Sequence, residues 1–172
     1  MNSAIVLTII ADDKPGIVEA VSKTLKSHNG NWTKSSMSSL AGQFAGILLA
    51  SVPEEEAEAC LAALKALEAD GLRIIIRVVS DEVPADRASK FFIQLVGNDR
   101  PGIVHDITSI LADHKVSVSS LETSVEGASM GGGELFKASA ELRVPEGSDI
   151  LALERNIEAL ANDLMVDIKL VK

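Results

Sequence analysis

The sequence predicts an α+β protein of two ferredoxin-like βαββαβ domains, each a four-stranded antiparallel sheet with two helices on one face. The first observation is a repeat. Asp-Lys-Pro-Gly at residues 13–16 returns as Asp-Arg-Pro-Gly at 99–102, 86 residues later, which is half of the 172-residue chain. The second is that strand-like and helix-like patterns follow each copy in the same order. We expect a first domain at 1–80, a linker at the polar stretch 81–88 and a second domain at 89–172.

The first half contains the six elements of one such domain. Alternating β-branched residues indicate its strands, and apolar residues at helical spacing, including Val21 and Leu25, indicate a helix after Pro15-Gly16. Pro53 and the three glutamates that follow it are typical of a second helix start. The strands are expected at 4–11, 31–40, 43–52 and 71–79, and the second helix at 53–69.

The second half repeats the order with one change. After His114 the offset between matching residues grows from 86 to 92, which indicates a six-residue insertion in the glycine-rich stretch 126–133. Asn29-Gly30 resembles a left-handed helix cap, and Val116 replaces its glycine, so we expect the two turns to differ. The strands are expected at 90–97, 116–125, 134–144 and 164–171, and the helices after Gly102 and around Leu153, Ile157, Leu160 and Leu164.

Strand alternation also predicts which side chains lie on the open face of each sheet, opposite the helices. In the second half these are Phe92, Gln94, Val96, Lys137, Ser139, Glu141 and Arg143. In the first half they are Val6, Thr8, Ile10, Ala45, Ile47, Leu49 and Ser51. Because the open-face residues of the first half are mostly apolar, we expect the other half or another subunit to cover them.

Charge and composition exclude several function classes. The formal net charge is −9 with no cluster of Lys or Arg, so direct binding of nucleic acid is not expected. The N-terminus lacks the basic region of a signal peptide, and the uncharged stretch 35–53 is too polar to span a membrane. We therefore expect a cytoplasmic protein without membrane contact.

The residues that usually perform catalysis or hold metals are scattered. The single cysteine, Cys60, lies on the apolar side of a predicted helix and is expected to be buried. Three histidines and one cysteine at unrelated positions do not form a metal site, and "MGGGE" lacks the Lys-Ser/Thr of a phosphate loop. No catalytic residue, metal or cofactor is expected.

The repeated loop can bind a ligand by its backbone. Proline at the helix start donates no N–H, and the amides of Gly16 and Ile17 remain free to bind a carboxylate. Asp12 and Asp13 lie close enough to accept an ammonium group, so a zwitterionic amino acid fits. We expect valine at Gly16 to block the ligand at little cost to the helix. The alternative is that Asp-x-Pro-Gly only starts a helix.

The tandem pattern with "DDKPGIV" and "NDRPGIV" resembles the ACT domain, a small module that senses amino acids. A chain of two such domains is most similar to the glycine cleavage system transcriptional repressor family. The resemblance implies a homo-oligomeric, non-enzymatic regulator that binds a small amino acid, preferably glycine or serine, between ACT units. The ligand-binding positions that it implies are Asp12, Asp13, Pro15, Gly16, Ile17 and Asn31, then Asn98, Asp99, Pro101, Gly102 and Ile103.

The same resemblance implies action through a separate DNA-binding activator or another regulatory protein, which agrees with the negative charge. Two alternatives stay open. In the first alternative the chain is a free-standing ACT module that regulates a metabolic enzyme by contact. In the second it is a ferredoxin-like enzyme such as an acylphosphatase. The second would need a phosphate-binding arginine loop, whereas Lys14 and Arg100 lie in matched loops without one.

Overall fold

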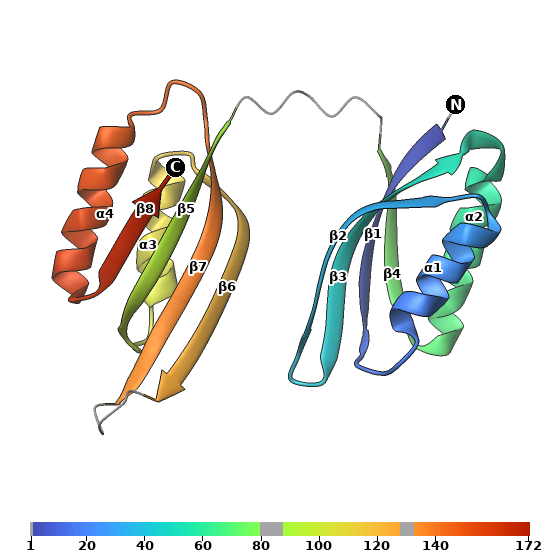
Figure 1. The fold of residues 1–172 in the computed structure, drawn as a ribbon, viewed down its shortest axis with the longest axis horizontal. Helices are drawn as coiled ribbons and strands as arrows, with labels where there is room; N and C mark the ends of the chain where they lie inside the picture. Colours follow the sequence, from blue (N-terminus) through green and yellow to red (C-terminus); the bar gives the residue numbers. More distant parts are fainter. Residues whose placement is uncertain (1, 80–87, 128–132) are drawn as a thin grey trace. The chain divides into compact units, whose positions relative to one another are not determined.

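The computed structural model describes residues 2–79, 88–127 and 133–172, and its chain separates into two compact units, Met1–Pro84 and Ala85–Lys172. Each unit is a βαββαβ fold whose two helices cover one face of a four-stranded antiparallel sheet (Figure 1). The predicted fold class is therefore confirmed. The predicted linker lies outside the described residues, apart from residue 88.

Unit 1 follows the predicted order of elements. It consists of β1 (Asn2–Asp12), α1 (Ile17–Ser27), β2 (Asn31–Leu40), β3 (Gln43–Pro53), α2 (Glu54–Ala66), the 3-10 turn η1 (Leu67–Asp70) and β4 (Arg73–Val79). The strand order is β2-β3-β1-β4, so the first strand is central and its two neighbours are β3 and β4. The predicted second helix ends earlier than expected because residues 67–70 tighten into η1.

Unit 2 has the same topology. It consists of β5 (Ser89–Asn98), α3 (Ile103–Asp113), β6 (Ser117–Gly127), β7 (Glu134–Val144), α4 (Ile150–Leu164) and β8 (Asp167–Val171), in the strand order β6-β7-β5-β8. Whereas α2 begins directly after Pro53, α4 begins only after Asp149, whose Oδ1 accepts a hydrogen bond from the Ala152 amide at 2.9 Å. Most of the glycine-rich insertion, residues 128–132, lies outside the described residues.

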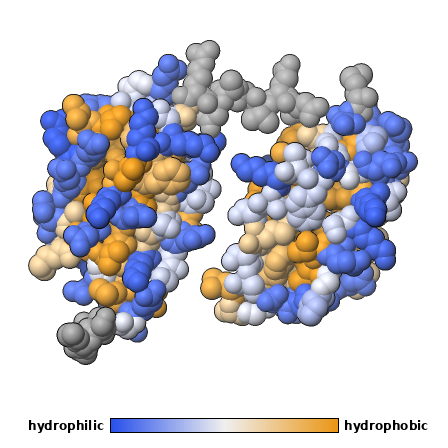
Figure 2. Space-filling view, viewed as in Figure 1, coloured by the Kyte–Doolittle hydropathy of each residue, from blue (hydrophilic) through white to orange (hydrophobic). Residues whose placement is uncertain are grey.

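Each unit has its own hydrophobic core between sheet and helices. In unit 1 the β1 residues Ile5, Leu7 and Ile9 pack in one buried cluster with residues of α1 and α2. Cys60 is fully buried in this cluster, as predicted, and burial together with the nearby Glu56 carboxylate raises the pKa of its thiol. In Figure 2, the side of unit 1 that carries α1 and α2 is mostly hydrophilic.

The strand registers confirm the predicted assignment of side chains to the two faces. Leu48 and Ala50 of β3 point to the core of unit 1, while Ile47 beside them is half exposed on the open face. In unit 2 the core positions of β7 include Ala140 and Leu142, and Glu141 between them lies on the open face.

The prediction that the turns after α1 and α3 differ is wrong. The left-handed residue is Asn29 (φ 54°) in one turn and Lys115 (φ 58°) in the other. In both turns the next amide closes the helix on the same carbonyl, Gly30 to Leu25 and Val116 to Leu111, each at 2.8 Å. A glycine is not required at this second position, because the preceding residue supplies the left-handed conformation.

Candidate functional site

The repeated Pro-Gly loops join β1 to α1 and β5 to α3. Gly16 and Gly102 precede the helices with φ of 96° and 93°, a left-handed conformation that L side chains rarely adopt. No side chain caps either helix, so the first amides of α1 and α3 keep their capacity to donate to an anion. A Cβ on either glycine would meet no atom within 4 Å, so the space above both loops is open.

In unit 1, neighbouring elements hold the loop side chains in place. The Asp12 Oδ1 accepts from Gln43 Nε2 at 2.7 Å, and the Asp13 Oδ2 accepts from Ser39 Oγ at 2.5 Å, so the β2–β3 hairpin positions both carboxylates. On the opposite side, the Lys14 ammonium donates to the Asp70 carbonyl oxygen at 2.8 Å. The loop of unit 1 is therefore tied to the hairpin and to the end of η1.

In unit 2 the loop is held by its backbone and by its own helix. Arg100 Nη2 donates to Asp106 Oδ2 of α3 at 2.8 Å. The backbone of Asp99 bonds to Glu134 at 2.8 Å, as Asp13 does to Gly42 at 2.9 Å. Within the described parts of the chain, the side chains of Asn98 and Asp99 make no hydrogen bond. The two loops therefore have the same backbone conformation but differ in the hydrogen bonds of their side chains.

A pocket of about 660 Å³ adjoins the unit 1 loop, where the ends of β1, β3 and β4 meet η1. Its lining residues are Ile10, Ala11, Asp12, Gln43, Glu68, Gly71, Leu72 and Arg73. Asp12 offers a carboxylate and Arg73 a guanidinium, and no ion pair joins either group to another described residue. The pocket thus combines the two charges that a zwitterion needs.

Sequence reasoning missed Arg73 and Gln43. Arg73 is a lone cation at the start of the apolar strand "RIIIRVV", and it approaches Asp12 because β4 pairs with β1 in the register that sets Arg73 opposite Ile10. A comparison of the two halves could have indicated Arg73, because the matching position at the start of β8 has Asp167 instead of a cation.

The residues expected to bind ligand in the first half do not all lie together. Asp12, Asp13, Pro15 and Gly16 share one loop, and the Ile17 side chain that follows is buried in the core. Asn31 lies at the other end of the sheet. It pairs with the β3 residue Ser51, whereas Asp12 pairs with Gln43, eight residues away along the strand and therefore about 27 Å distant.

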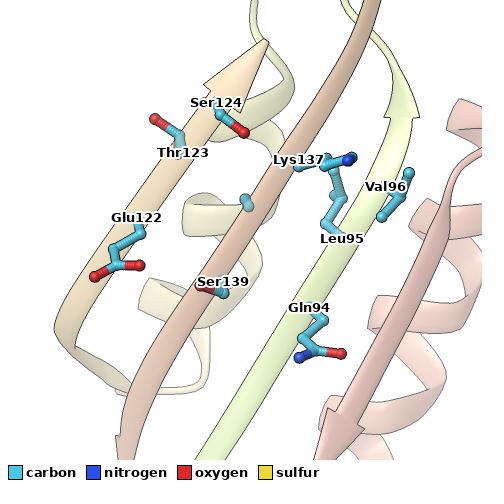
Figure 3. Close-up of a pocket in the computed structure, with 9 residues that line it drawn as sticks. Gln94, Leu95, Val96, Glu122, Thr123, Ser124, Lys137 and Ser139 are labelled. Carbon is cyan, nitrogen blue, oxygen red and sulfur yellow. The ribbon is translucent and has the colours of Figure 1, made fainter. Parts of the chain in front are cut away.

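The corresponding residues of unit 2 are arranged in the same way. Asn98, Asp99, Pro101 and Gly102 are exposed in one loop, and the Ile103 side chain is buried. A pocket of unit 2 has a volume of about 420 Å³ and does not adjoin the loop. It lies on the open sheet face, where Glu122, Ser139 and Gln94 project from three neighbouring strands (Figure 3). None of the expected ligand positions of unit 2 lines it.

The described residues offer neither a metal site nor a membrane-spanning helix. Among the described residues, no three His, Cys, Asp or Glu side chains gather closely enough to hold a metal ion. Every helix within the ranges 2–79, 88–127 and 133–172 is too short or too polar to cross a bilayer.

Two βαββαβ units, each with a Pro-Gly loop that opens onto an uncapped helix, define a tandem protein of small α+β modules. Residues 3–78 and 91–141 match two family models, both described as ACT domain. The chain therefore belongs to the ACT domain family and carries two ACT domains in tandem.

Solved structures of similar chains agree with this assignment. An unknown protein from Galdieria sulphuraria is 27% identical, with a TM-score of 0.88 over 99% of this chain and 98% of that one. A "putative glycine cleavage system transcriptional repressor" is 20% identical, with a TM-score of 0.67 over 99% of this chain and 96% of that one. At this identity the second likeness shows the fold alone. No curated protein matches the sequence.

Proposed function

We propose that this protein is a non-enzymatic, amino-acid-responsive regulator that acts by contact with a protein partner, and that it regulates transcription of a glycine cleavage system. The observation that carries the proposal is that one pocket holds both the Asp12 carboxylate and the Arg73 guanidinium, with Asp12 at the start of the Pro-Gly loop. ACT domains are regulatory modules, and the similar fold of the repressor structure supports the transcriptional role.

The pocket chemistry favours a small amino acid. A guanidinium binds a carboxylate through two parallel hydrogen bonds, and Arg73 supplies that group without an internal partner among the described residues. Asp12 accepts from an ammonium group, and Gln43 already holds its Oδ1 in place. The open space above Gly16 leaves room for the ligand backbone. Glycine and serine are the first ligands to test, on the family resemblance.

The two loops are not equivalent in this proposal. Unit 2 has Asn98 in place of Asp12 and Asp167 in place of Arg73, so its loop offers the Gly102 amide and the Asp99 carboxylate without an adjacent cation on β8. An amino acid carboxylate would meet repulsion from Asp167 there. We therefore place the ligand in unit 1 and assign the loop of unit 2 a weaker site.

Calorimetry across the amino acids tests the proposal on the full chain. Removing one charged partner should weaken binding about 10- to 100-fold, because a hydrogen bond to a charged group contributes about 1.5–3 kcal/mol. We expect this loss in Arg73→Gln and in Asp12→Asn, and wild-type binding in the matched control Asp167→Asn. If no amino acid binds the wild type, or if Arg73→Gln binds as tightly, the site is wrong.

Valine at Gly16 is a poorer test than expected from the sequence. The expectation that it costs little is wrong, because a φ of 96° places a β-branched residue in a strained conformation worth about 1–3 kcal/mol. Loss of binding and loss of stability would then occur together. The Arg73 and Asp12 substitutions avoid this problem, because both residues have extended backbone in strands.

The partner is the second part of the proposal. A net charge of −9 opposes contact with duplex DNA, so we propose action in the cytoplasm through a DNA-binding protein. Purified chain should give no gel shift with duplex DNA at physiological salt, and a shift would contradict the proposal. Affinity purification with mass spectrometry then separates the candidates, because a metabolic enzyme as specific partner would favour the free-standing ACT module instead.

A further inference from the structure

The open face of unit 1, opposite α1 and α2, carries an exposed apolar surface. Ile10, Ile47 and Ile75 come from β1, β3 and β4 and expose 43%, 51% and 61% of their area. Strand pairing places Ile47 and Ile75 on the two sides of Thr8, and Ile10 follows Thr8 on the same face of β1. Val6 and Leu49 extend the surface along the next pair of β1 and β3. A contiguous apolar surface of this kind marks a contact site.

Cations border this surface on both edges of the sheet. Lys34 of β2 pairs with Leu49, and Arg77 of β4 pairs with Val6, so one row across the sheet has a cation at each end. Neither cation has a hydrogen bond or an ion pair with a described residue. The described carboxylates at this face are Asp12, which accepts from Gln43, and Glu68, and both line the pocket at the far end of the face. The face is thus positive in a protein whose net charge is −9.

The open face of unit 2 shows that the fold does not require such a surface. The positions equivalent to Ile47 and Ile75 are Ser139 and Lys169. Two of its cations are paired within the face, Lys90 with Glu141 at 3.1 Å and Lys137 with Glu126 at 2.6 Å. Unit 2 also exposes Phe92, Val96 and Val171 on this face, but the centre of its face is polar. The apolar centre in unit 1 is therefore a property of that unit and not of the architecture.

We propose that the open face of unit 1 docks an acidic amphipathic helix of a partner protein, with an apolar stripe on the isoleucines and Asp or Glu side chains beside Lys34 and Arg77. A helix is the expected occupant because the opposite face of the same sheet already packs on two helices, and an apolar helix stripe buries against an apolar sheet face in the same way. The inference deepens the proposed action by protein contact by naming the kind of surface that the partner presents.

The charges disfavour a second copy as the occupant. If this face met itself, Lys34 and Arg77 of both copies would enter one interface that holds no carboxylate near them. Juxtaposed like charges suppress such pairing, whereas carboxylates at the border of a partner helix would speed encounter and fix its position.

Two synthetic peptides test the proposal with the full chain. Both are amphipathic helices with the same leucine stripe, one bordered by Glu and the other by Lys. In anisotropy titrations at low salt, the Glu peptide should bind at least about 10-fold tighter than the Lys peptide, and added salt should reduce the difference. Equal binding of the two peptides, or binding of neither, would overturn the proposal.

Variants locate the site on the face. Ile47→Lys should abolish binding of the Glu peptide, whereas Ser139→Lys, at the equivalent position of unit 2, should leave it unchanged. Arg77→Glu should reduce or reverse the preference for the Glu peptide. A melting curve checks that Ile47→Lys is folded, and a folded Ile47→Lys that still binds the peptide would overturn the proposal.

Two further measurements separate the alternatives. If the wild type is a dimer by light scattering and Ile47→Lys is a monomer, a second copy occupies the face and the proposal is wrong. Ile47→Lys should retain amino acid binding in calorimetry, because Ile47 does not line the pocket at Asp12 and Arg73. Failure of the docking surface and failure of the amino acid site therefore give different results.

Discussion

One row of four outward positions crosses the middle of each sheet, and the two units fill it with different chemistry. It consists of Ser36, Ile47, Thr8 and Ile75 in unit 1 and of Glu122, Ser139, Gln94 and Lys169 in unit 2. The inward positions beside it changed far less, since unit 1 has Leu48 and Ala50 where unit 2 has Ala140 and Leu142. Leucine and alanine exchange positions between the two units, so the summed volume of the two side chains is the same.

This difference shows which constraints outlast a duplication. A close-packed core tolerates exchanges that conserve volume and resists others. The open face has no such constraint, so its central row carries two isoleucines in unit 1 and polar or charged residues in unit 2. The loops follow the same rule, because both glycines keep their left-handed conformation while Asp12 and Asn98 differ.

The largest effects should come from shortening the cores. Leu48→Ala and Leu142→Ala should each cost their own unit about 2–5 kcal/mol, because both side chains are fully buried. Trp32 is the single tryptophan and lies in unit 1, so its fluorescence during urea unfolding reports that unit. Leu48→Ala should shift the tryptophan transition and Leu142→Ala should not. An equal shift in both variants would show that the units unfold together.

A smaller effect is expected from the one contact in which β3 and β7 differ by a methyl group. A Cβ at Gly46 would overlap the Met37 side chain, whereas unit 2 has Ala138 opposite Thr123. Gly46→Ala should therefore destabilise unit 1 by about 1–3 kcal/mol. Adding Met37→Thr copies the pair of unit 2 and should restore much of the loss. A double variant as unstable as Gly46→Ala alone would contradict this packing argument.

Cys60 provides a reporter of unit 1 alone, because it is the single cysteine of the chain and lies in α2. Burial raises the pKa of the Cys60 thiol, so less thiolate is present at neutral pH than in the unfolded chain. Iodoacetamide at pH 7.5 should thus label the native protein far more slowly than the urea-unfolded protein. Leu48→Ala should accelerate native labelling about tenfold or more, and Leu142→Ala should not. Rapid labelling of the native wild type would contradict the buried position.

The smallest effects are expected at the loop cations. Arg100 and Asp106 are both partly exposed, so Arg100→Gln should cost under about 1 kcal/mol. Lys14→Gln loses the bond to the Asp70 carbonyl oxygen and should cost about 1 kcal/mol. Thermal melts of both variants measure the difference. A loss of several kcal/mol in either would mean that the loop stabilises its unit more than its exposed contacts indicate.

The order of elements was predictable because each strand and helix carries its own period in the sequence, and the repeat confirms each assignment with a second copy. The pocket in unit 1 was not. Arg73 is about 60 residues from Asp12 in the chain, and the two approach only through the pairing of β1 with β4. The glycine in the turn after α1 predicts the wrong outcome for the second turn, because the left-handed residue is the one before it, Asn29 in one turn and Lys115 in the other.

The central position of β1 has a consequence for synthesis of the protein. Its neighbour β4 starts 63 residues after Ile10, which corresponds to about 3–13 seconds at ordinary translation rates. During that interval one edge of β1 has no partner, although residues 4–11, "AIVLTIIA", are apolar on both faces except for Thr8. An unpaired, uncharged β-strand of this kind is prone to pair with other chains. We therefore expect the emerging chain to depend on a ribosome-associated chaperone until Val79 has left the exit tunnel.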